Sequence, residues 1–228
     1  MIYQPMPPQL NVIPMGIIGG SAVLNPVQYA RQNSISRSVY TVNANQFRLL
    51  VGLKSYAPDF SSAEYYWLLC FVDEAACAPR FWTEYATGER QLAFARSKVK
   101  DLHYDFCEVI YLTQPEKTCR PFVVKDRVPE LCPPGPVTLI GDAAHPMSFC
   151  KFSLKKFSRC DTYSKLAVYG SGASAAIEDC ASLAERLYQA CWGQSSNEQA
   201  LRLYEGEMIS RVSETVLQAR EVSSDMQM

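Results

Sequence analysis

Short apolar runs in the first half of the chain predict strands of an antiparallel sheet. Segments 46–53 (QFRLLVGL) and 64–73 (EYYWLLCFVD) are rich in aromatic and aliphatic residues and are short, as strands are. Pro58 and Asp59 lie between them and favour a turn. We therefore expect two neighbouring strands that pair in antiparallel fashion.

A helical spacing follows in the segment Arg90–Thr113. Its apolar residues recur at the intervals of one helix face, which predicts a helix across the segment. These residues are Leu92, Phe94, Ala95, Val99, Leu102 and Phe106. His103 lies on or beside this helix, where a lone histidine is more often packed or solvated than catalytic.

Two more helices are predicted near the C-terminus. Ser174–Trp192 is amphipathic, with one apolar stripe. The stripe consists of Ile177, Ala181, Ala184, Leu187 and Cys191. The last helix begins at Ser196 and Gln199, which are spaced as a capping box. Its apolar face consists of Leu201, Tyr204, Met208 and Val212.

Two glycine-containing segments have an apolar character. Val137–Gly141 (VTLIG) follows the Pro133–Pro136 turn and is apolar enough to be a buried strand. Gly16–Gly20 (GIIGG) looks like a phosphate-binding loop, but it lacks GxGxxG spacing, and Pro26 comes too soon for a long helix. We interpret the second segment as a turn near a strand.

The composition is typical of a folded protein whose cysteines are reduced. The chain has 228 residues, of which 48% are hydrophobic and 20% charged. Its formal net charge of -1 gives no electrostatic case for nucleic acid or an anionic membrane as partner. Nine cysteines without CxxC spacing, and two histidines, argue against a metal site. The longest dense apolar run, Tyr65–Val72, is too short to span a membrane, and no signal-peptide pattern opens the chain. We expect a cytoplasmic protein.

Candidate chemistry lies in two separated stretches. Gly141 and Asp142 end the expected buried strand, where a carboxylate accepts hydrogen bonds from ribose hydroxyls or caps the next turn. Gly170 and Gly172 open the following helix, whose free amides and partial positive charge suit a pyrophosphate or a flavin carbonyl. A Walker loop is excluded because no Gly-Lys-Ser/Thr follows, and GxSxG is not matched, which leaves His145 without support as a general base.

Together these stretches resemble a known family. VTLIGDAAHPM followed by GSGASAAIEDCASLAERL is similar to the second flavin motif of class A flavoprotein monooxygenases, the group of para-hydroxybenzoate and salicylate hydroxylases. ALRLYEGEMISR resembles the tail helix of that family, so the resemblance covers about the last 100 residues. It implies that Asp142 holds the FAD ribose region, that backbone groups at Gly172 and Ala173 face the flavin ring, and that Pro146 lies beside the isoalloxazine. The implied FAD-binding residues are Gly141, Asp142, Pro146, Gly170, Gly172 and Ala173.

The sequence also departs from the family pattern. The GxGxxG motif and the middle Asp-Gly motif are absent, and Ser171 and Ser174 replace the usual Gln and Asn. The resemblance therefore implies an α/β (α+β) fold in an N-terminally truncated member, without the βαβ unit that holds the ADP half of FAD. We expect a substrate-domain-like region with an antiparallel sheet at 1–128, the C-terminal part of a Rossmann-like FAD-binding domain at 129–192, and a C-terminal helix at 193–228.

A segment of basic and aromatic residues separates the two halves of the motif. Ser148–Tyr169 is about 18 residues longer than the family spacing. It could be a lid or partner loop, or a tolerated surface insertion. A third interpretation fits better: codons for 150–152 can contain the intron donor GTAAGT, those for 167–168 can contain the acceptor CAG, and removing the span keeps the reading frame. We hypothesise that this span of 18 codons, inside the anomalous insertion at 149–168, is a retained short intron or a gene-model error, of the kind expected in a fungal gene.

The resemblance implies an FAD-dependent monooxygenase. NAD(P)H would reduce FAD, and one atom of O2 would go to a small organic substrate, aromatic or from secondary metabolism. The rival interpretation is an inactive truncated or mis-spliced fragment that binds no FAD, and a thiol-rich interaction module rests only on the cysteine count. The substrate is not readable, because aromatic side chains at strand spacing usually form the core rather than a pocket. The side chains in question are Trp67, Phe71, Trp82 and Tyr85.

Overall fold

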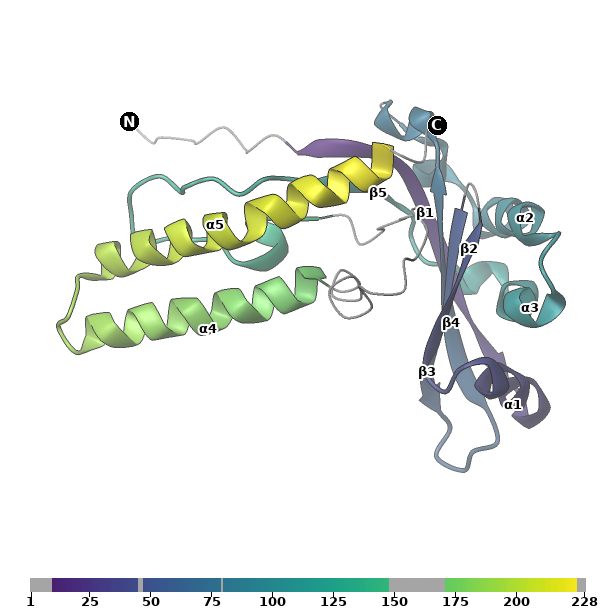
Figure 1. Ribbon diagram of the computed structural model, residues 1–228. Coiled ribbons are helices and arrows are strands. Elements are labelled where there is room, and N and C mark those ends of the chain that lie inside the picture. Colours follow the sequence, from purple (N-terminus) through teal and green to yellow (C-terminus); the bar gives the residue numbers. More distant parts are fainter. Residues whose placement is uncertain (1–9, 45–46, 79, 148–170, 225–228) are drawn as a thin grey trace, which may run out of the picture. The chain divides into compact units, whose positions relative to one another are not determined.

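The computed structural model describes residues 10–44, 47–78, 80–147 and 171–224 (Figure 1). The chain divides into two compact units. One is Pro14–Val124, and the other combines Met1–Ile13 with Lys125–Met228. The mixed α/β fold with an antiparallel sheet is the class that the sequence predicts.

The sheet has five strands in the order β2-β3-β4-β1-β5. They are β1 (Asn11–Leu24), β2 (Val39–Ala44), β3 (Phe47–Tyr56), β4 (Ala63–Val72) and β5 (Phe122–Asp126). The pairs β2–β3, β3–β4 and β4–β1 are antiparallel. The two strands expected at 46–53 and 64–73 are therefore confirmed as β3 and β4. In the turn between them, the Ser61 amide donates to the Asp59 carboxylate at 3.0 Å, which stabilises the turn.

Alternate residues of β4 build the core of the Pro14–Val124 unit. Tyr65, Trp67 and Phe71 are buried in it, together with residues of the helices α2 (Gly88–Val99) and α3 (Tyr104–Leu112). The Trp67 indole also donates to the Thr113 hydroxyl at 2.9 Å, so its polar atom is satisfied inside the core. Trp67 and Phe71 are thus core residues, whereas Tyr85 is exposed. Four 3₁₀ turns complete the described elements: η1 (Glu74–Cys77), η2 (Trp82–Tyr85), η3 (Pro115–Lys117) and η4 (Gly141–Ala143).

The interpretation of Gly16–Gly20 as a turn is wrong, because these residues lie inside β1. Glycine is needed there for close packing rather than for a turn. A Cβ atom at Gly19 would lie 2.7 Å from the Trp67 carbonyl oxygen and 2.7 Å from Leu68 Cδ2. Glycine in a strand interior often marks such a close approach.

The sequence reading also missed the helix α1 (Pro26–Ile35), which follows β1 directly. The Asn25 side chain accepts from the Gln28 amide at 3.0 Å, and the Gln28 side chain accepts from the Asn25 amide at 2.9 Å. This capping box, with Pro26 in the first turn, starts a helix. Pro26 therefore marks a helix start, and not an obstacle to one. Arg31 then ties α1 to the buried Glu108 of α3 at 2.7 Å.

The single helix expected at 90–113 is wrong in its middle. The structure has α2 and α3, separated by a turn in which the Leu102 amide donates to the Val99 carbonyl at 3.0 Å. His103 caps α3, since its Nδ1 accepts from the Asp105 amide at 3.4 Å. Both helices bury apolar side chains in the same core, so the apolar spacing runs across the turn as if the helix were continuous.

Two long helices dominate the second unit. The helices α4 (Ser171–Cys191) and α5 (Asn197–Ser224) lie side by side and run in opposite directions (Figure 1). The predicted capping box of α5 is confirmed: Ser196 N donates to Gln199 Oε1 at 3.0 Å, and Gln199 N donates to Ser196 Oγ at 3.1 Å. The predicted apolar face of α5 is confirmed too, because all its members are buried: Leu201, Tyr204, Met208 and Val212.

The apolar stripe of α4 does not face the core. Ile177 is 71% exposed, and the four other stripe residues are exposed as well. The side of α4 toward α5 is mixed instead: Asp179, Ser182 and Arg186 bond to side chains of α5, and Leu183 packs in the cluster that contains Tyr204 and Met208. An amphipathic pattern locates an apolar face, but it does not say which neighbour covers it. Among the described residues, the neighbouring helix takes the opposite face.

The predicted buried strand at Val137–Gly141 is also wrong. No strand pairs with this segment in the described part of the chain, and the side chains of Val137 and Ile140 are 67% and 38% exposed. An apolar run becomes a strand only where a neighbour satisfies its backbone. Here Tyr204 of α5 replaces that neighbour at one point, since its hydroxyl donates to the Leu139 carbonyl at 2.9 Å.

The C-terminal half of α5 is anchored to the end of β5. Arg220 Nε lies 2.9 and 2.8 Å from the two carboxylate oxygens of the buried Asp126. Asn11 Nδ2 donates to the same carboxylate at 3.1 Å. The hydrogen bonds to Asp126 raise the pKa of Arg220, so the guanidinium stays charged. In the part of the chain that the structure describes, no helix is both long and apolar enough to cross a bilayer.

Candidate functional site

The turn that carries Asp142 is tightly wound. The amides of Ala144 and His145 donate to the Gly141 carbonyl at 2.9 and 2.8 Å, closing the short helix η4. Gly141 has a φ of +53°, a left-handed conformation that favours glycine. A Cβ atom there would also lie 3.0 Å from the Cβ of Ala176 in α4. Glycine therefore lets this turn sit directly against α4.

The structure brings Asp142 next to the first turn of α4. A Cβ atom at Gly172 would lie 3.9 Å from Asp142 Oδ1 and 3.7 Å from Met147 Cγ. Asp142 and Ala173 are exposed, and Pro146 is half-buried. The two separated stretches of the sequence thus meet at one place, with an accessible carboxylate beside a helix start. Gly170 lies outside the described residues, and the roles of all these residues in FAD binding stay predictions.

A buried carboxylate of α4 holds this turn in place. Asp179 Oδ2 accepts from the Gly141 amide at 2.8 Å and lies 2.6 Å from His145 Nε2. Its other oxygen, Oδ1, accepts from Arg211 Nη2 of α5 at 2.6 Å. The side chains of Asp179 and His145 are both fully buried. One carboxylate therefore joins the turn to both helices.

The hydrogen positions in this cluster follow from the partners. Asp179 also accepts from the Gly141 amide and from Arg211, so the hydrogen of its contact with His145 is assigned to His145 Nε2. His145 Nδ1 is buried without a hydrogen-bond partner among the described residues. Arg211 Nε lies 3.2 Å from Glu178 Oε2, within ion-pair distance but without hydrogen-bond geometry.

Arg127 holds the same turn from another side. Its backbone amide donates to the Pro146 carbonyl at 2.9 Å, and its Nε donates to the Ala144 carbonyl at 3.0 Å. Its Nη2 also donates to the Ala143 carbonyl. The guanidinium thus satisfies the carbonyls of Ala143 and Ala144, which keeps the backbone of η4 fixed.

Asp179, Arg211 and Arg127 are residues that the sequence reading missed. A signal for Asp179 was present, because Gly172, Ala176 and Asp179 are spaced four and three residues apart and share one face of α4. A carboxylate on the same face as a candidate ligand-binding glycine invites a search for its partners. Arg127 and Arg211 carry no such local signal, since their contacts depend on the tertiary fold.

The arrangement suits a ligand with hydroxyls and an electron-rich or anionic end. The carboxylate of Asp142 can accept hydrogen bonds from hydroxyls, and the partial positive charge at a helix start attracts negative charge. Gly172 lies beside Asp142, with a Cβ position 3.9 Å from Asp142 Oδ1. These properties fit the flavin and ribityl part of FAD, for which Asp142, Gly172 and Ala173 are the candidate ligands.

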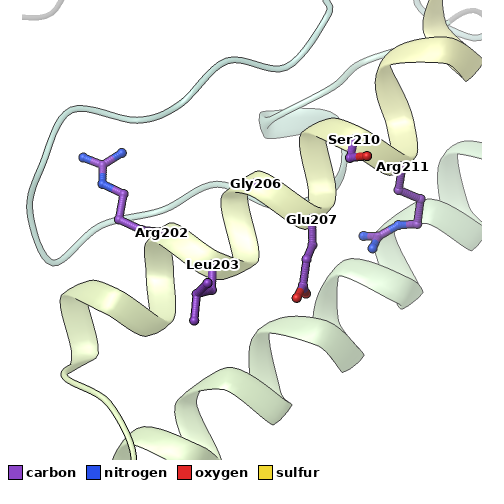
Figure 2. A pocket seen from close by; sticks show the side chains of 6 residues that line it. All are labelled: Arg202, Leu203, Gly206, Glu207, Ser210 and Arg211. Carbon is purple, nitrogen blue, oxygen red and sulfur yellow. The ribbon is translucent and has the colours of Figure 1, made fainter.

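A hollow on α5 is a second candidate, but its charged groups are occupied. It is lined by Arg202, Leu203, Gly206, Glu207, Ser210 and Arg211. Figure 2 shows Glu207 and Arg211 pointing toward α4. There Glu207 pairs with Arg186 and Ser182. On the other side, Arg202 donates to the Cys132 carbonyl at 2.6 Å. The charged side chains of the hollow therefore serve the pairing of α4 with α5 and other internal contacts. None of the charged lining residues is unpaired.

Comparison with known proteins points to one class. No family model matches the chain. The chain is 30% identical over 142 residues to the FAD-dependent monooxygenase thnD of Trichoderma harzianum, an overlap of 61% of this chain and 35% of that protein. The chain thus spans about a third of the curated relative, whose likeness supports the FAD-dependent monooxygenase family.

Two solved structures share the fold. One is assigned as an FAD-containing monooxygenase of Photorhabdus luminescens, with a TM-score of 0.65 and 18% identity, over 94% of this chain and 55% of that one. The other is 2,6-dihydroxypyridine-3-hydroxylase of Arthrobacter nicotinovorans, with a TM-score of 0.66 and 16% identity, over 96% of this chain and 53% of that one. At these identities the likeness shows the fold alone, over about half of each structure.

Proposed function

We propose that the chain supplies the flavin-facing part of the cofactor site and the substrate-domain sheet of an FAD-dependent monooxygenase. The observation that carries this proposal is the meeting of Asp142 with Gly172 at the start of α4. The sequence likeness to an FAD-dependent monooxygenase supports it. Bound FAD would supply the redox chemistry by which NAD(P)H and O2 oxygenate a small organic substrate.

The chain's own residues then act by positioning. Asp142 would accept hydrogen bonds from hydroxyls of the ribityl chain, which FAD and FMN share. The amides of Gly172 and Ala173 would hold the ring side of the flavin, where the partial positive charge of the helix start favours negative charge. Pro146 would border the same part of the cofactor. Gly141 sets the turn that presents Asp142.

The sheet supports an apolar or aromatic substrate. On the face of β3 and β4 opposite the helices, Leu50, Tyr66 and Leu68 are half-buried. A Cβ atom at Gly52 would lie 2.6 Å from the Tyr66 ring, so glycine allows the ring to lie over the strand. We propose that this smooth face forms the wall against which a flat organic substrate packs.

Titration of the purified chain with flavins tests the proposal. The sequence lacks GxGxxG, so we expect the chain to recognise the flavin end of FAD. We expect FAD to bind weakly enough that the purified chain is colourless. On binding, the fluorescence of added FAD and of added FMN is expected to be quenched until it saturates, with similar dissociation constants for the two flavins. ADP is expected neither to bind nor to compete. Equal binding of ADP would contradict the proposed site.

A second candidate is a fragment that binds no flavin. The exposed Val137 and Ile140 favour it, because an apolar segment without a paired neighbour is typical of an incomplete sheet. In that case the same titration gives no saturable quenching with FAD or FMN at any concentration. The proposed monooxygenase site and the inactive fragment are thus separated by one measurement.

A further inference from the structure

We propose that Asp179 is a positioning residue, through which Arg211 of α5 fixes the turn that presents Asp142. The inference rests on the proposed function only for its effect on FAD binding. Its geometric part is independent, because it concerns contacts between α4, α5 and the turn. Asp179 itself contacts the Gly141 amide and His145, and not the exposed Asp142 carboxylate.

The two oxygens of the Asp179 carboxylate bind different parts of the structure. Oδ2 serves the turn, at 2.8 Å from Gly141 N and 2.6 Å from His145 Nε2. Oδ1 serves α5, at 2.6 Å from Arg211 Nη2. A buried carboxylate keeps its charge only where partners compensate the lost hydration. Removal of the Arg211 guanidinium therefore weakens the carboxylate's hold on Gly141 and His145, although Arg211 itself does not contact them.

A second ion pair between the same helices separates this task from ordinary helix pairing. Arg186 of α4 pairs with Glu207 of α5, and Ser182 donates to Glu207 at 2.8 Å. Among the described residues, these hydrogen bonds and this ion pair join α4 to α5 and do not involve the turn. Loss of Arg186 weakens the helix pair but leaves the bonds of Asp179 to Gly141 and His145 intact. Arg186 is therefore a matched control for Arg211.

The turn has a reason to need this hold. Gly141 is in a left-handed conformation, and the bond from its amide to Asp179 fixes that conformation against α4. Asp142 follows directly, so a change at Gly141 moves the Asp142 carboxylate away from Gly172. A small displacement of a binding group is enough to reduce affinity, because the site must be held close to its binding geometry.

Hydrogen exchange of the 141–147 backbone tests the proposal in the full chain, alongside FAD titration of each variant. In Arg211→Gln, exchange of these amides is expected to rise about tenfold and FAD affinity to fall about tenfold. Arg211→Lys, which keeps the charge and one donor, and Arg186→Gln are expected to stay close to the wild type in both measurements. Asp179→Asn, which keeps the size and an acceptor for Gly141, provides a second variant if Arg211→Gln does not fold.

The result that overturns the proposal is equal exchange of 141–147 in Arg211→Gln and Arg186→Gln. Failure of the proposed function looks different. If the wild-type chain binds no FAD, the exchange comparison still decides whether Arg211 and Asp179 position the turn. If FAD binds and its affinity is unchanged in Arg211→Gln despite faster exchange, the coupling of the turn to the cofactor site is refuted.

Discussion

His145 and Asp179 meet at 2.6 Å, Nε2 to Oδ2, with both side chains fully buried. They lie on opposite sides of segment 148–170, which is outside the described residues. The two ends of the interrupted motif are therefore joined by a direct contact. A long insertion adds only a modest entropic cost to such a closure, so the motif can form around it.

The first prediction concerns the donor that His145 gives to Asp179. His145→Leu removes this donor and leaves the buried carboxylate with one partner fewer, at a cost of about 2 kcal/mol in the free energy of unfolding. His145→Gln retains an amide donor and is expected to lose less than half of that. Urea unfolding of both variants measures the difference. Equal losses would show that the hydrogen bond is not what stabilises the turn.

The second prediction concerns the left-handed turn. Gly141→Ala is expected to lower the free energy of unfolding by roughly 1–2 kcal/mol, because φ is +53° and the new methyl group meets Ala176. Gly206→Ala is the control, since no atom lies within 4 Å of a Cβ atom there. In the interior of α5, it is expected to stabilise by about 1 kcal/mol. Thermal or urea unfolding of the pair gives opposite signs, and a loss in both variants would contradict the account.

The third prediction concerns pH. The hydrogen bond from Arg186 lowers the pKa of Glu207, and Ser182 adds to the effect. A lowered pKa in the folded state means a contribution that is present above the ordinary glutamate value and is lost as pH falls through the folded value. The effect is small, because both side chains are partly exposed. Comparison of unfolding free energies between about pH 6 and pH 3 should show a weaker decrease in Arg186→Gln than in the wild type; identical decreases would count against the ion pair.

The fourth prediction concerns the span between the possible splice sites in codons 150–152 and 167–168, which we hypothesise to be non-coding. Sequencing of the mature transcript across these codons is expected to find a spliced form that lacks about 18 codons. Such a form restores the short spacing between Met147 and Gly170. A mature message that always retains the segment would contradict the hypothesis and would favour the lid and surface-loop interpretations.

Local sequence signals predicted the elements whose partners are near in the chain. Ser196 and Gln199 form their capping box because both residues belong to one helix turn. The strands β3 and β4 are neighbours joined by a tight turn, so their pattern suffices. Elsewhere the predictions of secondary structure are wrong because they depend on contacts between residues far apart in the sequence. Val137–Gly141 is apolar but pairs with no strand among the described residues, and Gly19 serves a cross-strand contact that no local pattern reveals.

The candidate site follows the same division. Asp142 and Gly172 were predicted from motif residues and do come together. Asp179 and Arg211, which hold the turn, were not, because the Gly141–Asp179 and Asp179–Arg211 contacts join residues far apart in the sequence.

The central claim is that Asp142 and the start of α4 bind the flavin side of FAD. The most direct test is the dissociation constant of FAD for the wild type, Asp142→Asn and the exposed control Asp101→Asn, measured by quenching of flavin fluorescence. The account predicts saturable binding to the wild type and to Asp101→Asn, and an affinity at least about tenfold lower for Asp142→Asn. Unchanged affinity in Asp142→Asn, or no saturable binding to the wild type, would contradict it.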